Sequence, residues 1–448
     1  MRPALESPPA EDPAPPLWER AAAMFVVIML TGAFVGPVFA PTQAETPILR
    51  LIWLPVYAII IALVALRADR VARAWPALLM VLALVLHAYA SKYWSIDAET
   101  TARRVLAMGM ASVFAVYLGV VFRGVHLPRL LMGMGLILGV GSLVFVFAFP
   151  AIGVHHGDND GLWRGLWYEK NQMGGIMVAG AAASAACLAS EQTRHRWLPF
   201  IALLVTTLLV LATQSKTSLL CLLLAVGLIA GLWAMRRGGA AFSVVAIWVG
   251  VVLIATGTYV FITEPAVVLK ALGKDPSLTG RTDIWVSLMH KVSVHPWTGY
   301  GYQAFWGRES VPAMFVRAET GWPVPSAHNG WIDLLVQLGW PGAVAVGIVV
   351  AVGFFGSVSR VATDGPKEGW WALGYFLAFL LLSLSESVLL SHANLPWVLM
   401  LAIVARATAF APDTSRVPLA PAARGAYQQR PRIAAHSAHA RQRAVPVR

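Results

Sequence analysis

Residues 197–235 read WLPFIALLVTTLLVLATQSKTSLLCLLLAVGLIAGLWAM, and this stretch determines the fold class. Two long apolar runs flank the polar turn QSK, whose Lys216 is the single charged residue in the stretch. A helix needs about 20 predominantly apolar residues to cross the hydrocarbon core of a bilayer, and each run is close to this length. The stretch therefore predicts two transmembrane helices joined by a tight turn.

The same pattern recurs along most of the chain. Hydrophobic residues make up 58% of the 448 residues and charged residues only 12%, about half of the charged share of a soluble protein. In lipid every backbone amide must be hydrogen-bonded within its own segment, which favours helices. The sequence thus predicts an all-α, polytopic integral membrane protein with about twelve transmembrane helices. The predicted spans are 21–44, 51–66, 74–91, 105–122, 130–157, 171–190, 197–215, 217–235, 238–263, 334–359, 369–385 and 387–405.

The two ends of the chain differ in composition from the rest. Residues 1–20 are rich in proline, and residues 411–448 combine seven arginines with one acid in a Pro/Ala-rich stretch. Neither segment can build a core, so both are expected to be disordered extensions of a membrane domain at 21–410. An even number of spans puts both termini on one side, and the arginines make that side cytoplasmic. The basic tail suits anionic membrane lipid, and no nucleic-acid partner is expected.

One connection between spans is much longer than the others. Residues 264–327 form a polar segment of roughly 60 residues, which the predicted topology places on the outer, periplasmic side. Its content of Trp, Tyr, Pro and Gly favours a folded loop that covers a site. The cations Arg164, Lys170, Lys216 and Arg281 fall on the same side. Gathered cations suit a diphosphate, and a guanidinium suits it especially because it pairs with two oxygens at once.

Most of these motifs also have a purely structural interpretation. An Arg that follows Trp, as in residues 163–164, is typical of an anchor at the membrane surface. The pair Gly174-Gly175 permits close packing of helices, and Gly299 with Gly301 indicates a turn.

Residues 329–339 are predicted to form a helix of their own. Apolar side chains from Trp331 to Leu338 follow the spacing i, i+3, i+4, i+7, which predicts an amphipathic helix on the outer leaflet. His328 would then stand at the N-terminus, where the helix dipole disfavours a charged imidazole. A neutral imidazole at this place can act as a base, and the alternative role for His328 is that of a helix cap.

Five motifs follow one another on the predicted outer side: Arg164 with Lys170-Asn171, Lys216-Thr217-Ser218, Gly280-Arg281 with Trp285, His295-Pro296 through Gly299-Tyr300-Gly301, and His328-Asn329 with Gly339. This ordered set resembles the O-antigen ligase/polymerase superfamily, the Wzy-type polymerases and WaaL-type ligases of bacterial surface polysaccharides. The resemblance covers about residues 160–342. Its Lys-Asn-x-Met-Gly and Ser-Lys-Thr-Ser pieces are most similar to the exopolysaccharide polymerases.

The resemblance implies an activity and roles for single residues. Proteins of this family transfer a glycan from an undecaprenyl-diphosphate carrier to a sugar hydroxyl at the periplasmic face of the inner membrane. By resemblance, Arg164 and Arg281 would bind the diphosphate and His328 would serve the acceptor. The chemistry agrees, because the leaving diphosphate needs charge stabilisation and the attacking hydroxyl needs a base active near neutral pH. The residues expected to contact the substrates are Lys170, Asn171, Lys216, Asn329, Asp283 and Glu386.

The most specific function that the resemblance implies is polymerisation of exopolysaccharide or O-antigen repeat units. One alternative is a ligase that joins the glycan to lipid A core. Another is a flippase for the same lipid-linked sugars, which would need charged groups along a path through the membrane, whereas the predicted spans are charge-free. The expected partners are the lipid-linked glycan, an acceptor glycan or glycolipid, and polysaccharide assembly proteins; no cofactor is expected.

Three acidic positions allow more than one interpretation. Residues 155–160, HHGDND, have the Asp-x-Asp pattern of metal-dependent glycosyltransferases. Those enzymes use cytoplasmic nucleotide sugars, whereas this loop is predicted to face outward, so no metal is expected. Asp283 either orients Arg281 or is solvated in the loop. Glu386 lies near a predicted helix end, and ionisable residues within membrane segments are functional by default.

Overall fold

A computed structural model describes residues 13–410 except 36, 38–46, 158, 191–194 and 264–279. The described residues contain helices and turns but no β-strand, apart from one isolated bridge between Val154 and Trp163. The all-α prediction is therefore confirmed. The predicted tail 411–448 lies outside the described residues.

The first described helix begins at Leu17, inside the segment that the composition assigns to the N-terminal extension. The helices, in chain order, are α1 (Leu17–Leu30), α3 (Pro47–Leu66), α4 (Ala68–Ala72), α5 (Trp75–Ala90), α6 (Ala98–Val121), α7 (His126–Ala148), α8 (Pro150–Gly153), α9 (Lys170–Ala189), α10 (Trp197–Ala212), α11 (Lys216–Thr263), α13 (Arg281–Val294), α14 (Val311–Thr320), α15 (Gly330–Asp364), α16 (Gly369–Ser383) and α17 (Leu395–Thr408). Two 3₁₀ turns, η1 (Ser91–Tyr93) and η3 (Gly365–Lys367), extend α5 and α15.

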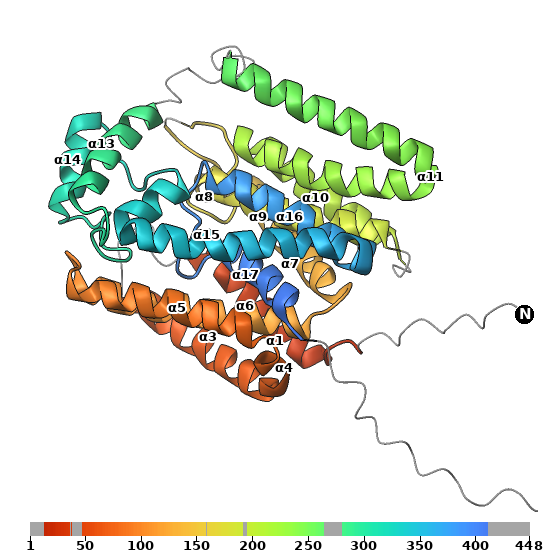
Figure 1. Cartoon of the computed structure of the whole chain (residues 1–448), viewed down its shortest axis with the longest axis horizontal. Coiled ribbons are helices and arrows are strands. Elements are labelled where there is room, and N and C mark those ends of the chain that lie inside the picture. The colour runs from red at the N-terminus through yellow and green to blue at the C-terminus, as the bar shows by residue number, and fades with distance from the viewer. Residues whose placement is uncertain are drawn as a thin grey trace, which may run out of the picture. The chain divides into compact units, whose positions relative to one another are not determined.

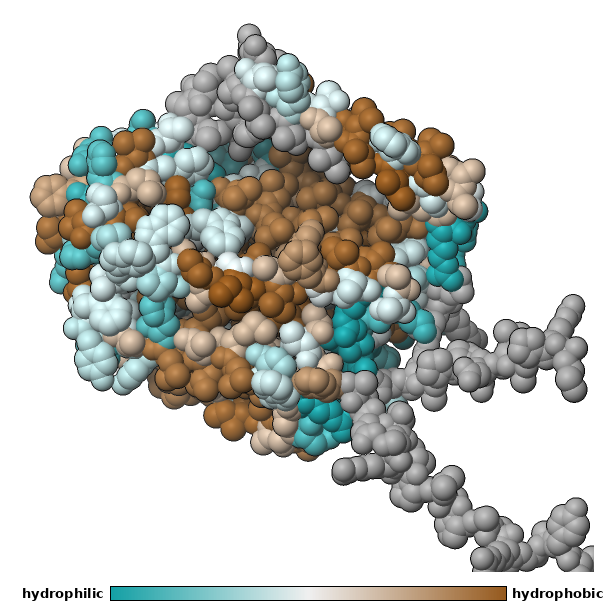
Figure 2. Space-filling view, viewed as in Figure 1, coloured by the Kyte–Doolittle hydropathy of each residue, from teal (hydrophilic) through white to brown (hydrophobic). Residues whose placement is uncertain are grey.

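Within the described residues, 6 helices are long and apolar enough to cross a membrane. Shorter apolar helices accompany them at Leu51–Leu66, Trp197–Ala212, Gly369–Ser383 and Leu395–Thr408. In Figure 2 hydrophobic residues dominate the surface over α5, α11 and α15, and hydrophilic residues gather toward its two sides. The chain is accordingly a multi-pass membrane protein, while twelve crossings stay a prediction.

The last two predicted spans differ from the structure. Helix α16 ends at Ser383 and α17 begins only at Leu395, so the helix predicted from residue 387 is wrong over its first two turns. The side-chain oxygen of Asn394 caps α17 by accepting a backbone hydrogen bond of 3.2 Å. The connection 384–394 is therefore a turn that carries Glu386, and a charge-free window cannot reveal such a turn.

Helix α15 is in fact two helices that meet at Gly339, where φ is 65° and ψ is −168°. A Cβ atom on Gly339 would lie 2.6 Å from the carbonyl oxygen of Pro296, so only glycine allows this approach. The backbone N–H of Trp340 donates to the same carbonyl at 2.8 Å. The first part of α15 is thus the separate helix that the spacing predicts, and it begins at Gly330.

Other segments of the protein cover the polar face of this first part of α15, while its place at the outer leaflet stays a prediction. Its polar residues Asp333 and Gln337 are buried, as are its leucines. The indole N–H of Trp306 donates to Asp333 at 2.6 Å, and the backbone N–H of Gln303 donates to Gln337 at 2.8 Å. The segment around residues 300–310 therefore covers the polar face. Periodicity shows that a helix has a polar face but not which part of the protein covers it.

Helix α9 lies at the centre of the described fold. It packs against α7, α10, α11 and α16, and every residue from Met173 to Cys187 is buried. A side chain on Gly174 would overlap Ser218 of α11, so the predicted packing role of this glycine is confirmed. In Figure 1 α13 and α14 lie at one end of the long helices, and the turn within α11 lies at the opposite end. The N-terminus of α9 points toward the first of these ends.

Candidate functional site

The carboxylate of Glu386 is the point where three separate elements meet. The side-chain amide of Asn171, in the first turn of α9, donates to Oε1 of Glu386 at 3.0 Å. Nη2 of Arg281, the first residue of α13, lies 3.7 Å from the same oxygen. Nδ1 of His328, just before α15, lies 3.7 Å from Oε2. Four residues that the sequence singles out thus converge around one acidic group.

His328 is held in an unusual conformation beside this carboxylate. Its φ is 47°, in the left-handed region that few residues other than glycine adopt. Its ring stacks on Trp322 at 5.6 Å with 3° between the planes. Neither ring nitrogen has a hydrogen-bond partner among the described residues. Backbone strain of this kind tends to occur at functional sites, and a ligand hydroxyl would satisfy the imidazole.

The guanidinium of Arg281 is held by a hydrogen bond to the protein but is still partly exposed. Its Nη1 donates to the backbone carbonyl of Ser385 at 2.8 Å, which ties the start of α13 to the connection 384–394. About a fifth of its side chain is exposed, 19%, so the guanidinium can still meet a ligand. The 3.7 Å distance to Glu386 is too long for a hydrogen bond. An anionic ligand could therefore compete for this guanidinium.

A cavity of about 430 Å³ borders the cluster. Asn171 and Glu386 belong to both, so the charged groups lie at the cavity wall. The lining also includes residues that are not among the predicted site residues, such as Ser326 and Ser391. Tyr168 lies within the segment Trp163–Asn171, and Gln172 directly follows this segment. In the sequence, only their position next to charged residues suggests a role for them. Further lining residues are Thr31, Gly175, Ser387 and Asn394.

The N-terminus of α9 is capped by a histidine that the sequence suggests only as a metal ligand. Nε2 of His155 accepts a hydrogen bond of 3.1 Å from the backbone N–H of Lys170, so this nitrogen carries no proton. Burial, with the charges of Arg164 and Lys170, lowers the pKa of His155 to about 4. Burial, with the neighbouring Glu386 carboxylate, also raises the pKa of Glu169. His155 therefore orients the part of α9 that carries Asn171.

Replacement of His155 by glutamine should make the thermal stability less dependent on pH. In the unfolded chain an imidazole takes up a proton near pH 6.5, whereas the folded His155 does so only near pH 4. The stabilisation is thus complete above pH 6.5 and is lost as the pH falls toward 4. Glutamine can accept the same hydrogen bond without titrating. Melting in detergent from pH 4 to 7.5 tests this, and parallel curves for the two proteins would contradict it.

The remaining predicted residues have other surroundings. Within the described residues Arg164 does not share the Glu386 carboxylate; its guanidinium donates to the carbonyls of Ile152 and Ala151, at 2.8 and 3.2 Å. Lys216 begins α11, near enough to Lys170 for their charges to interact.

Two further candidates have structural roles in this fold. The side-chain oxygen of Asn329 caps α15 by accepting the N–H groups of Trp331 and Ile332, at 3.0 and 3.1 Å. Asp283 is exposed in the first turn of α13, where a negative charge suits the helix dipole. Neither contact brings these side chains to the Glu386 carboxylate. Substrate contacts by Asn329 and Asp283 stay predictions.

No group of three or more metal-ligating side chains occurs in the part of the chain that the structure describes. His156 and Asp160 lie 3.7 Å apart on an exposed surface, and Asp158 lies outside the described residues.

Comparisons with known proteins agree with the motifs. Residues 200–347 match the O-antigen ligase family, and this range contains Lys216, Arg281 and His328. The exopolysaccharide production protein ExoQ of Rhizobium meliloti (strain 1021) is 26% identical over 245 residues, which are 51% of this chain and 55% of that protein. The chain thus spans about half the length of the curated relative that it matches. These findings confirm the resemblance that the motifs carry: residues 200–347 of this chain are similar to the O-antigen ligase family, and the chain is similar to an exopolysaccharide production protein.

Proposed function

We propose that this protein transfers a glycan from an undecaprenyl-diphosphate carrier to a sugar hydroxyl. The observation that carries the proposal is the convergence of Asn171, Arg281 and His328 on Glu386, beside a cavity of about 430 Å³. A cation for the leaving diphosphate and a base for the acceptor are the two groups that this reaction needs. The similarity to the O-antigen ligase family supports the same chemistry.

Arg281 would bind the donor diphosphate. The guanidinium of an arginine can pair with two phosphate oxygens, and its charge stays at any physiological pH. Its Nη2 lies 3.7 Å from Oε1 of Glu386. A bound diphosphate would take this place, and Glu386 would keep its hydrogen bond from Asn171 and its position beside His328. Lys170 and Lys216 would add positive charge around the donor, and Arg164 would do so from the loop before α9.

His328 would take the proton of the attacking hydroxyl. The acceptor oxygen forms a bond to the anomeric carbon of the donor while the bond from that carbon to the diphosphate oxygen breaks. Undecaprenyl diphosphate leaves, and the proton moves to a ring nitrogen of His328. The nearby Glu386 carboxylate stabilises the imidazolium that results. Direct displacement at the anomeric carbon inverts its configuration.

The proposal includes the place of the reaction. The donor carrier is a membrane lipid, so we assign the protein to the bacterial inner membrane with Glu386 on the periplasmic side and both termini in the cytoplasm. The excess of arginine at the C-terminus supports this orientation.

We infer polymerisation as the specific reaction, supported by the similarity to an exopolysaccharide production protein. Purified protein that receives only lipid-linked repeat units should then give a ladder of longer lipid-linked products and release undecaprenyl diphosphate. The same protein with His328→Ala is the control for background. A mixture that reacts only after lipid A core is added would show a ligase instead. Movement of the lipid-linked glycan across a vesicle membrane without product formation would show a flippase.

A further inference from the structure

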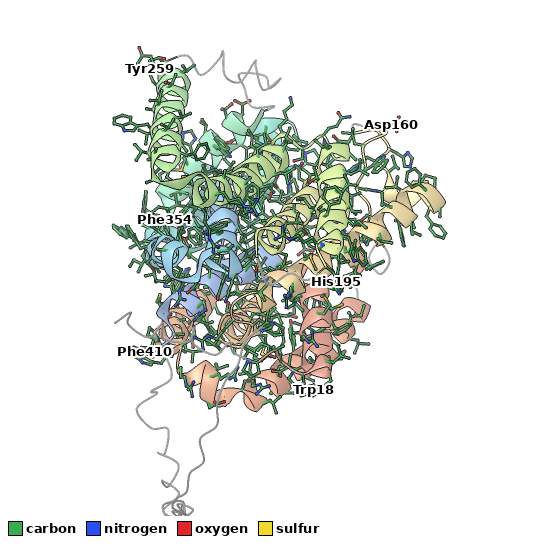
Figure 3. All side chains as sticks on the ribbon, turned by 90° about the vertical axis from the view of Figure 1, so that its right-hand side faces the viewer. Trp18, Asp160, His195, Tyr259, Phe354 and Phe410 are labelled. Carbon is green, nitrogen blue, oxygen red and sulfur yellow. The ribbon has the colours of Figure 1, made fainter. Side chains whose placement is uncertain are left out.

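Two adjoining cavities lie at the end of the helices opposite α13 and α14, far from Glu386. The first is an apolar groove of about 300 Å³ between α10 and α11, with α9 beneath it. All its lining residues but one are apolar; the exception is Arg196, at the start of α10. The lining consists of Ala185, Leu188, Ala189, Arg196, Leu203, Val226, Ile229, Ala230 and Trp233. Figure 3 looks onto this end of the protein and labels His195, the residue before Arg196.

The second cavity is polar and has a volume of about 570 Å³. Ser190 and Arg236 line it together with residues 361–367 and Trp370. Ser190 directly follows Ala189 of the apolar groove, and Arg236 lies one helical turn beyond Trp233. The two cavities are therefore neighbours, one suited to hydrocarbon and the other to a polar group.

Among the residues that the structure describes, positive charge dominates the boundary between these cavities. Arg196 is exposed at the mouth of the groove, and the guanidinium of Arg237 lies 4.2 Å above the ring of Trp233. The acid that lines the polar cavity, Asp364, is paired with Arg360 at 2.7 Å, so it does not cancel this charge. The hydroxyl of Ser190 is buried and has no hydrogen-bond partner among the described residues. A phosphate oxygen would satisfy it.

We propose that these two cavities bind an anionic glycerophospholipid. An acyl chain fills the apolar groove, and the phosphate lies against Arg196 and Arg236. Zwitterionic lipids fit less well because their own cation faces the arginines. A basic pocket between membrane helices is a typical site for an anionic headgroup.

The site is separate from the one proposed for the lipid-linked donor. The second part of α15, residues 340–364, is about 37 Å long at 1.5 Å per residue. This length exceeds the hydrocarbon core of about 30 Å, so the two sites lie at opposite membrane surfaces. The phospholipid contacts α9, α10 and α11 together. Because α9 and α11 begin at Lys170 and Lys216, a lipid that holds them together also stabilises the frame of the catalytic site.

The test measures binding and needs no enzymatic activity. Delipidated protein in a non-ionic detergent receives either phosphatidylglycerol or phosphatidylcholine, and bound lipid is counted by native mass spectrometry. Phosphatidylglycerol should be retained and should raise the melting temperature by about 5 °C, because it binds the folded state alone. Arg196→Gln removes the headgroup contact, and Ala230→Phe fills the groove. Each variant should therefore lose both the retention of phosphatidylglycerol and the rise in melting temperature. Arg20→Gln, an exposed arginine on α1, is the matched control.

Three outcomes would overturn the proposal. Equal retention of phosphatidylcholine would show that the charge of the lipid headgroup does not determine binding. Undiminished retention of phosphatidylglycerol in Arg196→Gln, which changes an exposed side chain and should fold, would place the lipid elsewhere. A polyprenyl phosphate that replaces phosphatidylglycerol on the wild type, and that Ala230→Phe does not retain, would identify the carrier lipid as the occupant.

Discussion

Replacement of His328 by alanine is expected to lower the turnover of glycan transfer by about 10²–10⁴-fold, the usual cost of removing a positioned base. The donor should still bind, because the diphosphate contacts come from Arg281 and the lysines. Release of undecaprenyl diphosphate from purified protein measures turnover, and binding of radiolabelled donor measures the retained affinity.

His290→Ala provides the matched control for this change. His290 lies on α13 and is exposed, so its loss should leave the reaction unchanged. Full activity of His328→Ala would mean that another group accepts the proton. Glu386 would then be the first candidate for the base, because it lines the cavity of about 430 Å³ described above.

Replacement of Arg281 by lysine should lower kcat/KM by about 10²-fold or more, even though the charge is kept. Lysine offers a point charge and cannot pair with two phosphate oxygens at once. A planar guanidinium can bind the carbonyl oxygen of Ser385 and a phosphate at the same time, whereas a lysine ammonium cannot do so in this geometry. The connection 384–394 therefore loses its hydrogen bond to the start of α13. The measurement is the rate of product formation at several donor concentrations, with protein level determined by immunoblot.

The control for lysine substitution is Arg308→Lys, at an exposed arginine in the loop before α14. This variant should behave as the wild type does. If Arg281→Lys kept near-normal kcat/KM, a point charge would suffice at this position. The proposed two-oxygen contact with the diphosphate would then be wrong, while the assignment of His328 would not be affected.

Much of the fold could be predicted because hydropathy is a local property of the chain. A run such as 197–215 cannot be solvated along its length, so its helical form follows from composition alone. The close approach of Gly174 to α11 could also be predicted, since a glycine pair in an apolar helix permits it. The five motifs that follow one another between Arg164 and Gly339 indicated the resemblance to the superfamily as an ordered set.

The positions of helix ends, and the coverage of helix faces by other segments, are not local properties of the chain. The window 387–405 contains no charge, yet α17 begins only at Leu395. The spacing after His328 predicts an amphipathic helix, but it does not show that Trp306 covers the polar residue Asp333. Both outcomes depend on segments that are distant in sequence, and no periodicity records them.

The sequence by itself determined the all-α class of the protein and the residue types available for chemistry. Only the tertiary structure decided which of those residues act together. Asn171, Arg281 and His328 belong to three elements spread over more than a hundred residues, and each alone has a plain structural role. They meet because α9, α13 and α15 all begin around the connection that carries Glu386. Chain order cannot show this meeting, because a contact between distant segments depends on the packing of every helix between them.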